Sequence, residues 1–470
     1  MSMRGSPESI IAHHLRLVGV HSGANLRIMF RPGAMAAETI QLSSQMPMLY
    51  VVLQPQADFA AVLGVTILER KKRPPEIFRL VTDSSSSWSR LRTLHAADAF
   101  HHEAGRPVVC DLEAQPVWMW LSIGRGGILF VGTDLAGDLV RYRQGDPDCA
   151  NSRPTEALWG IAGERPNYLF EAQLAGEDGA ARHADGWAMA LAETVAEKLG
   201  QPLADILPGG APGAIVLTGD DDQAYLEKYD EQLALLGDTP ITYLLHPLTR
   251  HTPKTLQAMR KRNRGVDFGI HPDALDAPQR YGELFDHQVA WYRGLTGASP
   301  VSLRNHGFLN DGYWGHLEAW LKHGVGISSN LPGFDGRILN GSLLPARMAW
   351  KGKLSRHWSV LTAIGDGVRI VSGMSDEDAA DRIWMLADRI RQSQLPGVMV
   401  LNLHPQNVSD TRAMHLAAKE NVRGGFVAWN LRQCWEWFAR MDSCDVSTME
   451  EARPGLLSRL WCRSKRRILA

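Results

Sequence analysis

Several features that would identify a specialised class of protein are missing from this sequence of 470 residues. Its five cysteines are scattered and include no CxxC pair, so neither a thiolate zinc site nor a disulfide framework is indicated. Acidic and basic residues almost balance, and the net charge of -1 gives no global electrostatic reason to expect nucleic acid as a partner. These absences leave a globular protein with reduced thiols as the expectation.

Long apolar runs are also missing. The first apolar stretches of the chain are interrupted by His13, His14 and Arg16, unlike the continuous apolar core of a signal peptide. No run approaches the roughly 20 apolar residues that a membrane-spanning helix needs. We therefore expect a cytoplasmic protein.

The length of the chain predicts two domains, because a single core rarely grows to this size. The best boundary is the segment LPGGAPG, Leu207–Gly213, whose two prolines and three glycines would break a helix or a strand. The expected organisation is an N-terminal domain (1–206), a linker (207–213), a second domain (214–445) and a basic C-terminal tail (446–470).

The second domain alternates between strand-like and helix-like segments. The strand-like segments are Ala214–Leu217, Ile241–Leu245, Val266–Ile270 and Val398–Leu403, and helical patterns occupy Tyr225–Leu236, Thr252–Arg264 and the residues after a candidate N-cap at Ser375. Such alternation favours a parallel α/β sheet or barrel. In these folds the chemistry lies at the C-terminal ends of the strands.

The N-terminal half is less regular. A helical pattern covers His183–Leu199, and in the segment Pro116–Tyr142 a glycine turn joins two apolar strands. This segment resembles the late strands of glutamine-amidotransferase-like or flavodoxin-like α/β domains. No nucleophilic cysteine stands on a strand-to-helix elbow, so we expect an α/β domain without catalytic activity.

Three consecutive aspartates, Asp220, Asp221 and Asp222, follow the first strand of the second domain. Like charges this close are unfavourable unless a cation or a proton relieves them. One interpretation is a divalent metal with one carboxylate left free as a base. The alternative is an acidic first turn of the next helix, which the helix dipole would favour.

Histidines follow other strand-like segments. His271 comes directly after Val266–Ile270, and His404 emerges from the most apolar strand, where an imidazole could serve as a general acid. Arg304 and His306 lie two residues apart in the segment SLRNHGF. Each of these residues taken alone could equally be an ordinary surface or core residue.

Taken together, the segments T-G-D-D-D, F-G-I-H, L-R-N-H and L-N-L-H resemble, in this order, the motifs of the polysaccharide deacetylase family (NodB homology, carbohydrate esterase family 4). The resemblance covers residues 214 to about 441. It implies a deformed (β/α)7 barrel and a metal-dependent carbohydrate N-deacetylase. The expected cytoplasmic location then favours a role in surface polysaccharide biosynthesis.

The resemblance also assigns roles. Asp220 would be the general base, Asp221 or Asp222 a metal ligand, His271 a second ligand and His404 the general acid. Arg304 would orient the base. Leu275 stands where the family's HxxxH motif has another histidine, and His306 is our substitute for that ligand, giving a site suited to zinc.

The implied substrate is an acetylated sugar, as a nucleotide-linked or lipid-linked glycan precursor if the protein is cytoplasmic. Tyr313 and Trp314 could form a platform for a sugar ring, with core packing as the alternative. The basic tail could lie on an anionic membrane surface. Two rival functions remain: a non-catalytic glycan-binding or scaffold protein on a decayed deacetylase fold, and a barrel hydrolase acting on another C–N bond.

Overall fold

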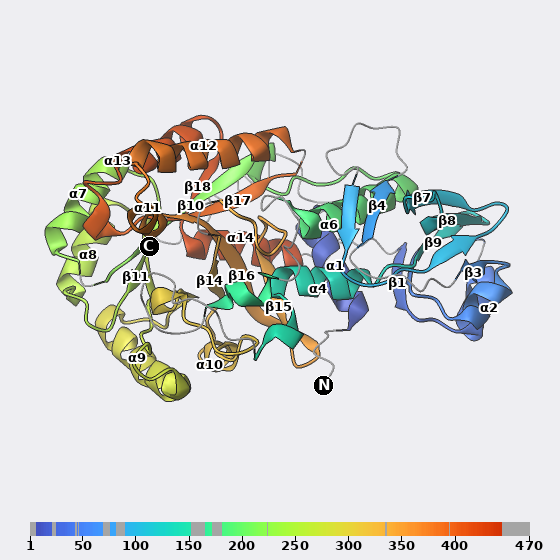
Figure 1. Cartoon of the computed structure of the whole chain (residues 1–470), viewed down its shortest axis with the longest axis horizontal. Helices are drawn as coiled ribbons and strands as arrows, with labels where there is room; N and C mark the ends of the chain where they lie inside the picture. Colours follow the sequence, from blue (N-terminus) through green and yellow to red (C-terminus); the bar gives the residue numbers. More distant parts are fainter. Residues whose placement is uncertain are drawn as a thin grey trace, which may run out of the picture.

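The computed structural model contains a mixed α/β domain and a barrel, which lie side by side along the long axis of the molecule (Figure 1). The described residues are 6–20, 25–42, 45, 47–68, 76–80, 90–151, 165–171, 181–222, 224–333, 336–393 and 395–443. The expected basic tail, 446–470, lies outside these residues.

Seven parallel strands close the barrel. Their order is β11 (Ile241–Leu245), β12 (Val266–Ile270), β13 (Ser302–Leu303), β14 (Ile327–Pro332), β16 (Lys353–Gly365), β17 (Gly397–Asn402) and β10 (Gly213–Asp220). The circle is complete because β10 pairs with both β17 and β11. Two further strands join it: β18 (Val427–Trp429) pairs with β10, and β15 (Ala346–Trp350) runs antiparallel to β16. The (β/α)7 barrel expected from the sequence is thus confirmed.

Barrel strands are buried where helices cover them from outside. Every residue of β10 and of β17 is buried, as is typical of parallel strands with helices on the outer face. The surrounding helices are α7 (Leu226–Leu236), α8 (Pro253–Arg262), α9 (Tyr281–Thr296), α10 (Leu317–Lys322), α11 (Asp366–Ser372), α12 (Asp376–Gln392), α13 (Arg412–Arg423) and α14 (Leu431–Ser443). The expected N-cap is present, since the Ser375 side chain accepts a hydrogen bond from the backbone N–H of Asp378.

The N-terminal domain is built on a seven-stranded mixed sheet. Its order is β1 (Leu26–Phe30), β2 (Leu49–Leu53), β9 (Gly126–Val131), β8 (Pro116–Ile123), β7 (Arg106–Cys110), β4 (Glu76–Leu80) and β5 (Arg90–Thr93); the first three strands are parallel and the remaining pairings antiparallel. A separate pair joins β3 (Thr66–Leu68) to β6 (Ala99–His101). The expected α/β class and the glycine turn between β8 and β9 are both present.

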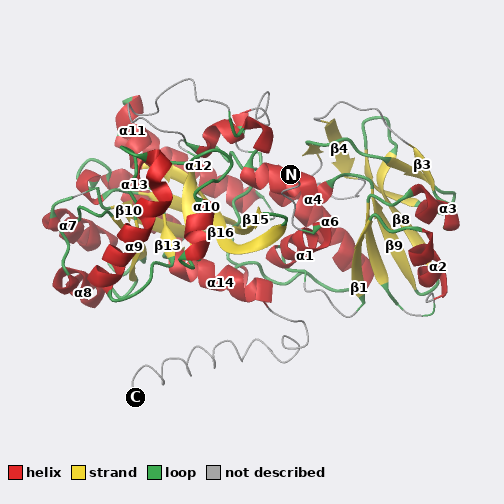
Figure 2. Cartoon of the chain, turned by 90° about the horizontal axis from the view of Figure 1, so that it is seen from below, coloured by secondary structure: helices red, strands yellow, loops and turns green. Residues whose placement is uncertain are grey.

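Helices cover both faces of this sheet (Figure 2). On the side of the barrel lie α1 (Pro7–Leu17), α4 (Leu135–Gln144) and α6 (His183–Leu199). On the opposite face α2 (Ala34–Leu42) and α3 (Ala57–Val62) pack over a smaller cluster. Among the described residues, a layer of helices therefore lies between the N-terminal sheet and the barrel.

One hydrophobic core is continuous across the two domains. It joins Trp118 and Trp187 of the N-terminal domain to barrel residues such as Trp358 and Val398. Hydrogen bonds reinforce the contact: the Arg143 guanidinium donates to the carbonyl of Leu344 at 2.8 Å. Between β14 and β16 the described residues form the strand β15 and no helix, so helices of the N-terminal domain cover this flank of the barrel.

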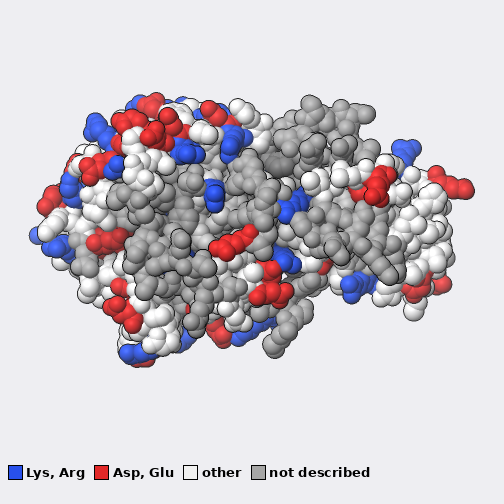
Figure 3. Space-filling view, in the orientation of Figure 1, with Lys and Arg blue, Asp and Glu red and all other residues white. Residues whose placement is uncertain are grey.

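The surface facing the viewer in Figure 3 shows basic and acidic side chains interspersed over the barrel helices. None of the helices in the described part of the chain combines the length and the apolar composition needed to cross a membrane.

Candidate active site

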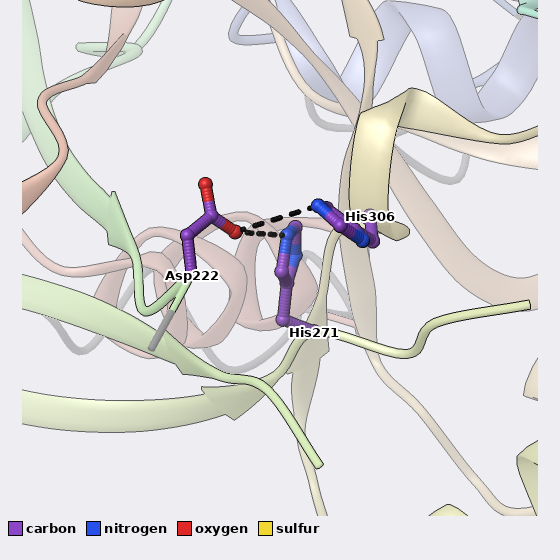
Figure 4. Close-up of side chains that lie close together, drawn as sticks. All are labelled: Asp222, His271 and His306. Carbon is purple, nitrogen blue, oxygen red and sulfur yellow. Dashed lines mark ion pairs between the residues drawn. The ribbon is translucent and has the colours of Figure 1, made fainter. Parts of the chain in front are cut away.

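Three side chains converge at the C-terminal ends of the barrel strands. Asp222 follows β10, His271 follows β12, and His306 begins a short 3-10 turn after β13. The Oδ1 atom of Asp222 lies 3.3 Å from Nε2 of His271 and 3.7 Å from Nε2 of His306 (Figure 4). These three residues form one of two groups in the described chain that could hold a metal ion.

The environment of His271 determines which of its nitrogens carries a proton. Its Nδ1 lies 2.7 Å from the carbonyl oxygen of Arg304, which can only accept, so Nδ1–H is the donor. The lone pair of Nε2 is thereby left facing Asp222. Oδ1 of Asp222 is buried and has no hydrogen-bond partner among the described residues.

The spacing of these donors fits a cation. Ligands about 2.1 Å from a tetrahedral zinc ion are separated from one another by about 3.4 Å, close to the 3.3 Å and 3.7 Å found here. Two imidazole nitrogens and a carboxylate are ligands that zinc accepts. The residues of the group therefore fit a divalent metal.

The backbone of Asp222 is strained. Its φ of 35° lies in the left-handed region, which costs a residue other than glycine on the order of 1 kcal/mol. Such strain persists where the surroundings impose it, and it is frequent at functional sites. Here it accompanies the turn that directs the carboxylate toward the two histidines.

Asp220, the last residue of β10, is held by two donors. The Arg304 guanidinium donates to Oδ1 at 2.8 Å, and the Asn402 amide donates to Oδ2 at 2.8 Å. Burial raises the pKa of Asp220, but the positive charges of Arg304, His271 and His404 together outweigh it and hold the pKa below its usual value. The carboxylate is therefore ionised and oriented, as a general base must be.

Arg304 is completely buried inside the barrel. Besides Asp220, its guanidinium donates to the hydroxyls of Thr218, Ser329 and Thr362 at 2.9 to 3.0 Å. A planar donor fixed on so many sides gives Asp220 a single orientation.

His404 stands on the other side of Asp222. Its Nδ1 donates to the carboxylate of Asp366, and its Nε2 faces Oδ2 of Asp222 at 3.3 Å and Oδ2 of Asp220 at 3.6 Å. Burial lowers the pKa of His404, but the Asp366 and Asp222 carboxylates raise it well above its usual value. A protonated imidazole in this place can serve as a general acid.

The structure separates the two aspartates that the sequence left as alternatives. Asp221 points away from the histidines, because its carboxylate accepts hydrogen bonds from the Tyr229 hydroxyl and from the backbone N–H of His246. The turn after Asp220, with its left-handed φ at Asp222, directs Asp222 toward the histidines while Asp221 faces away. In this structure Asp222, and not Asp221, is the ligand candidate.

The structure does not place Tyr313 and Trp314, expected from the sequence as a sugar platform, on an exposed surface. Both side chains are buried, and the Trp314 indole donates to the carbonyl of Gln144 in the N-terminal domain at 2.7 Å. Trp314 therefore packs at the contact between the domains and offers no face to a ligand. The sequence could not show this, because the partner residue is distant in the chain.

Sequence reasoning missed several polar residues around the site: Asp366, Asn402, His246 and Asp273. Asp366 follows β16 and His246 follows β11, so both carry the strand-end signal that identified His271 and His404. Asp273 lies two residues beyond His271, and its carboxylate is 3.1 Å from Nε2 of His246 and 3.4 Å from Nδ1 of His306. The second candidate metal group consists of His246, Asp273 and His306, and it shares His306 with the first group.

No family model matches the chain, and no curated protein matches it. Solved structures described as polysaccharide deacetylases are similar to it: one from Pseudomonas aeruginosa PAO1 at 13% identity and a TM-score of 0.42, and one from Mycobacterium smegmatis at 17% identity and a TM-score of 0.39. A peptidoglycan deacetylase from Bacillus subtilis is similar at 14% identity and a TM-score of 0.33. Each match covers 51% of this chain, and 95%, 93% and 98% of the respective structure.

Proposed function

We propose that the barrel is a metal-dependent hydrolase that removes the acetyl group from an N-acetylated sugar. The observation that carries the proposal is the convergence of Asp222, His271 and His306 on one point, flanked by the Asp220–Arg304 pair and the His404–Asp366 pair. Hydrolysis of an amide needs a base to deprotonate water and an acid to protonate the departing amine. Both are present beside the ligand group.

The third candidate ligand, His306, is relevant to the rival interpretation, in which the barrel is a decayed fold without catalytic activity. That interpretation relied on Leu275, which stands where a histidine would complete the family's motif. His306 comes from the next strand end and supplies a third donor at 3.7 Å from Asp222. The group therefore has three candidate ligands despite Leu275, which supports an active enzyme.

The residues would divide the reaction as follows. A divalent cation, once bound, supplies Lewis acidity at the amide carbonyl. Asp220, fixed by Arg304 and Asn402, accepts a proton from the attacking water. His404, held by Asp366, gives the proton of its Nε2 to the departing nitrogen, so that acetate and a free amino sugar result.

The test uses the purified full chain and two measurements. We expect one zinc ion per chain, and acetate release from an N-acetylated sugar supplied as a free oligosaccharide, as a nucleotide-linked sugar and as a lipid-linked sugar. Asp222→Asn should lose zinc, with Kd raised at least ~100-fold, because a neutral amide is a poor ligand. Its acetate release should fall with the zinc.

Asp238→Asn is a matched control, since Asp238 is an exposed carboxylate away from the site. It should keep both zinc and activity. Zinc binding without acetate release from any of the three substrates would exclude a sugar deacetylase and direct attention to another amide substrate.

A further inference from the structure

The two candidate metal groups share His306, and a single imidazole cannot present the same lone pair to both. In the first group His306 faces Asp222 through Nε2 at 3.7 Å. In the second it faces Asp273 through Nδ1 at 3.4 Å. A neutral imidazole has one protonated and one unprotonated nitrogen, so only one side can receive the cation.

The backbone around His246 shows which of the two groups can receive the cation. The N–H of Leu248 points at Nδ1 of His246 at 3.1 Å, and because a backbone N–H can only donate, Nδ1 is the unprotonated nitrogen. The proton of a neutral His246 is then on Nε2, which faces Oδ2 of Asp273 at 3.1 Å. A protonated nitrogen is no metal ligand, so the second group is unsuited to a cation.

The same oxygen, Oδ2 of Asp273, faces both His246 and His306. Asp273 is itself fixed: Gln288 on α9 accepts from its backbone N–H and donates to its carbonyl, and the N–H of Leu275 binds Oδ1. Nδ1 of His306 is buried, and a small rotation of the imidazole would bring it from 3.4 Å into hydrogen-bond range of Oδ2.

We propose that Asp273 is the positioning residue that makes His306 a metal ligand. Its carboxylate accepts a hydrogen bond from Nδ1–H of His306 and so directs the Nε2 lone pair toward Asp222 and His271, while His246 holds the carboxylate in place without touching the ion. Carboxylates behind histidine ligands act in this way in metal sites generally. The inference rests on the proposed metal site of the barrel.

The experiment measures zinc affinity of the full chain by competition with a chromophoric chelator. Asp273→Asn and Asp273→Ala should each raise the Kd for zinc by about 10- to 100-fold, the usual cost of losing such a partner. Asp273 is about a third exposed, at 32%, so both variants should fold, which circular dichroism checks. An unchanged Kd in folded Asp273→Asn would overturn the inference.

Two further variants distinguish this arrangement from a cation in the second group. His246→Gln should leave the Kd within about threefold, whereas Asp222→Asn should lose zinc. The opposite pattern, with zinc lost in His246→Gln and retained in Asp222→Asn, would place the ion between His246, Asp273 and His306 and refute the proposal.

Asp286→Asn is the matched control, because Asp286 also pairs with a histidine, His323, but on α9 away from the site. Its zinc affinity should not change. The result is separable from the proposed function: a weakened Kd in Asp273→Asn with no deacetylation by the wild type would keep this inference and reject the activity. Deacetylation by the wild type together with an unchanged Kd in Asp273→Asn would keep the activity and reject this inference. A wild type without zinc affinity would refute the inference and the proposed function alike.

Discussion

At the scale of single residues, each histidine of the site has a defined acceptor behind it. His271 donates to a backbone carbonyl, His404 to Asp366, and His306 faces Asp273. Nε2 of each imidazole faces Asp222, and the acceptor on the side of Nδ1 favours that orientation. The imidazoles nevertheless differ in role, since Nε2 of His271 faces Asp222 as a candidate ligand, whereas the Asp366 and Asp222 carboxylates raise the pKa of His404 well above its usual value and favour its charged form.

His404→Gln should lower the rate of acetate release by about 100- to 10,000-fold while leaving the zinc content intact, because the residue donates a proton and does not bind the ion. Asp366→Asn should lower the rate less, since the imidazole stays but loses the charge that raises its pKa. Turnover and zinc content are measured on the same preparations. Loss of zinc together with activity in His404→Gln would mean that His404 is a ligand.

The sequence alone was enough to bring most of these residues together. Asp220, His271 and His404 could be identified because each ends an apolar strand or follows one, and Arg304 because its segment resembles the family's arginine motif. The sequence did not distinguish Asp221 from Asp222, since the turn after β10 decides which carboxylate faces inward. It also did not reveal Asp366, because the long strand β16 before it was not recognised.

At the scale of elements, the site depends on how closely neighbouring strand ends approach. A Cβ added to Gly219 in β10 would lie 2.9 Å from the carbonyl oxygen of Leu403, just beyond β17. The obstacle is backbone, which has little freedom to move. Asp220 and His404 flank this contact, so the absence of a side chain at Gly219 sets the distance between the proposed base and acid.

Gly219→Ala should therefore destabilise the protein by about 1 to 3 kcal/mol, the usual cost of overpacking. It should also lower the rate of acetate release, because Asp220 and His404 are pushed apart. Gly282→Ala on α9 is the control, since nothing lies within 4 Å of a Cβ there, and alanine is favoured in a helix. Unchanged activity in a folded Gly219→Ala would show that the strand ends tolerate the shift.

Regular elements were predictable where a single periodicity extends over the whole segment. The pattern at His183–Leu199 matches α6 from end to end, and Ile241–Leu245 and Val266–Ile270 match β11 and β12. The strand β13 could not be found in this way, because it has only two residues and gains its place by pairing with β12 and β14. Pairing of that kind leaves no local signal.

At the scale of the whole molecule, the linker expected at 207–213 does not separate two independent cores. The residue Leu207 is buried, and the core of the N-terminal domain continues into the barrel through Trp358 and Val398. The N-terminal half thus completes the flank of the barrel between β14 and β16. In the loop after β13, the Trp314 indole donates to the carbonyl of Gln144 and so joins the barrel to this half of the chain.

A partly buried ion-pair cluster also joins the two halves, and its carboxylate is Asp442 on α14. Oδ1 of Asp442 accepts from Nδ1 of His13 at 2.9 Å and from Nε of Arg16 at 2.8 Å, both on α1. Arg347 on β15 donates to Oδ2 at 3.0 Å. His13 is neutral near pH 7, because burial lowers its pKa and its Nε2 accepts the backbone N–H of Arg347.

This cluster predicts a stability difference that depends on pH. Burial raises the pKa of Asp442, but His13 and Arg16 together lower this pKa by more than burial raises it. The pKa of Asp442 in the folded protein therefore lies below the value of about 3.9 for an unfolded aspartate. A carboxylate with a lowered pKa stabilises the fold fully above the unfolded value, and this stabilisation is lost as the pH falls through the folded value. Asp442→Asn should therefore reduce the free energy of unfolding by about 2 kcal/mol at pH 7, and the deficit should shrink below about pH 4.

Urea unfolding at pH 7 and pH 3 measures both values, with Glu436→Gln at an exposed position of the same helix as the control. An equal deficit at both pH values would mean that Asp442 holds the two halves together by packing and neutral hydrogen bonds, and that its charge contributes nothing.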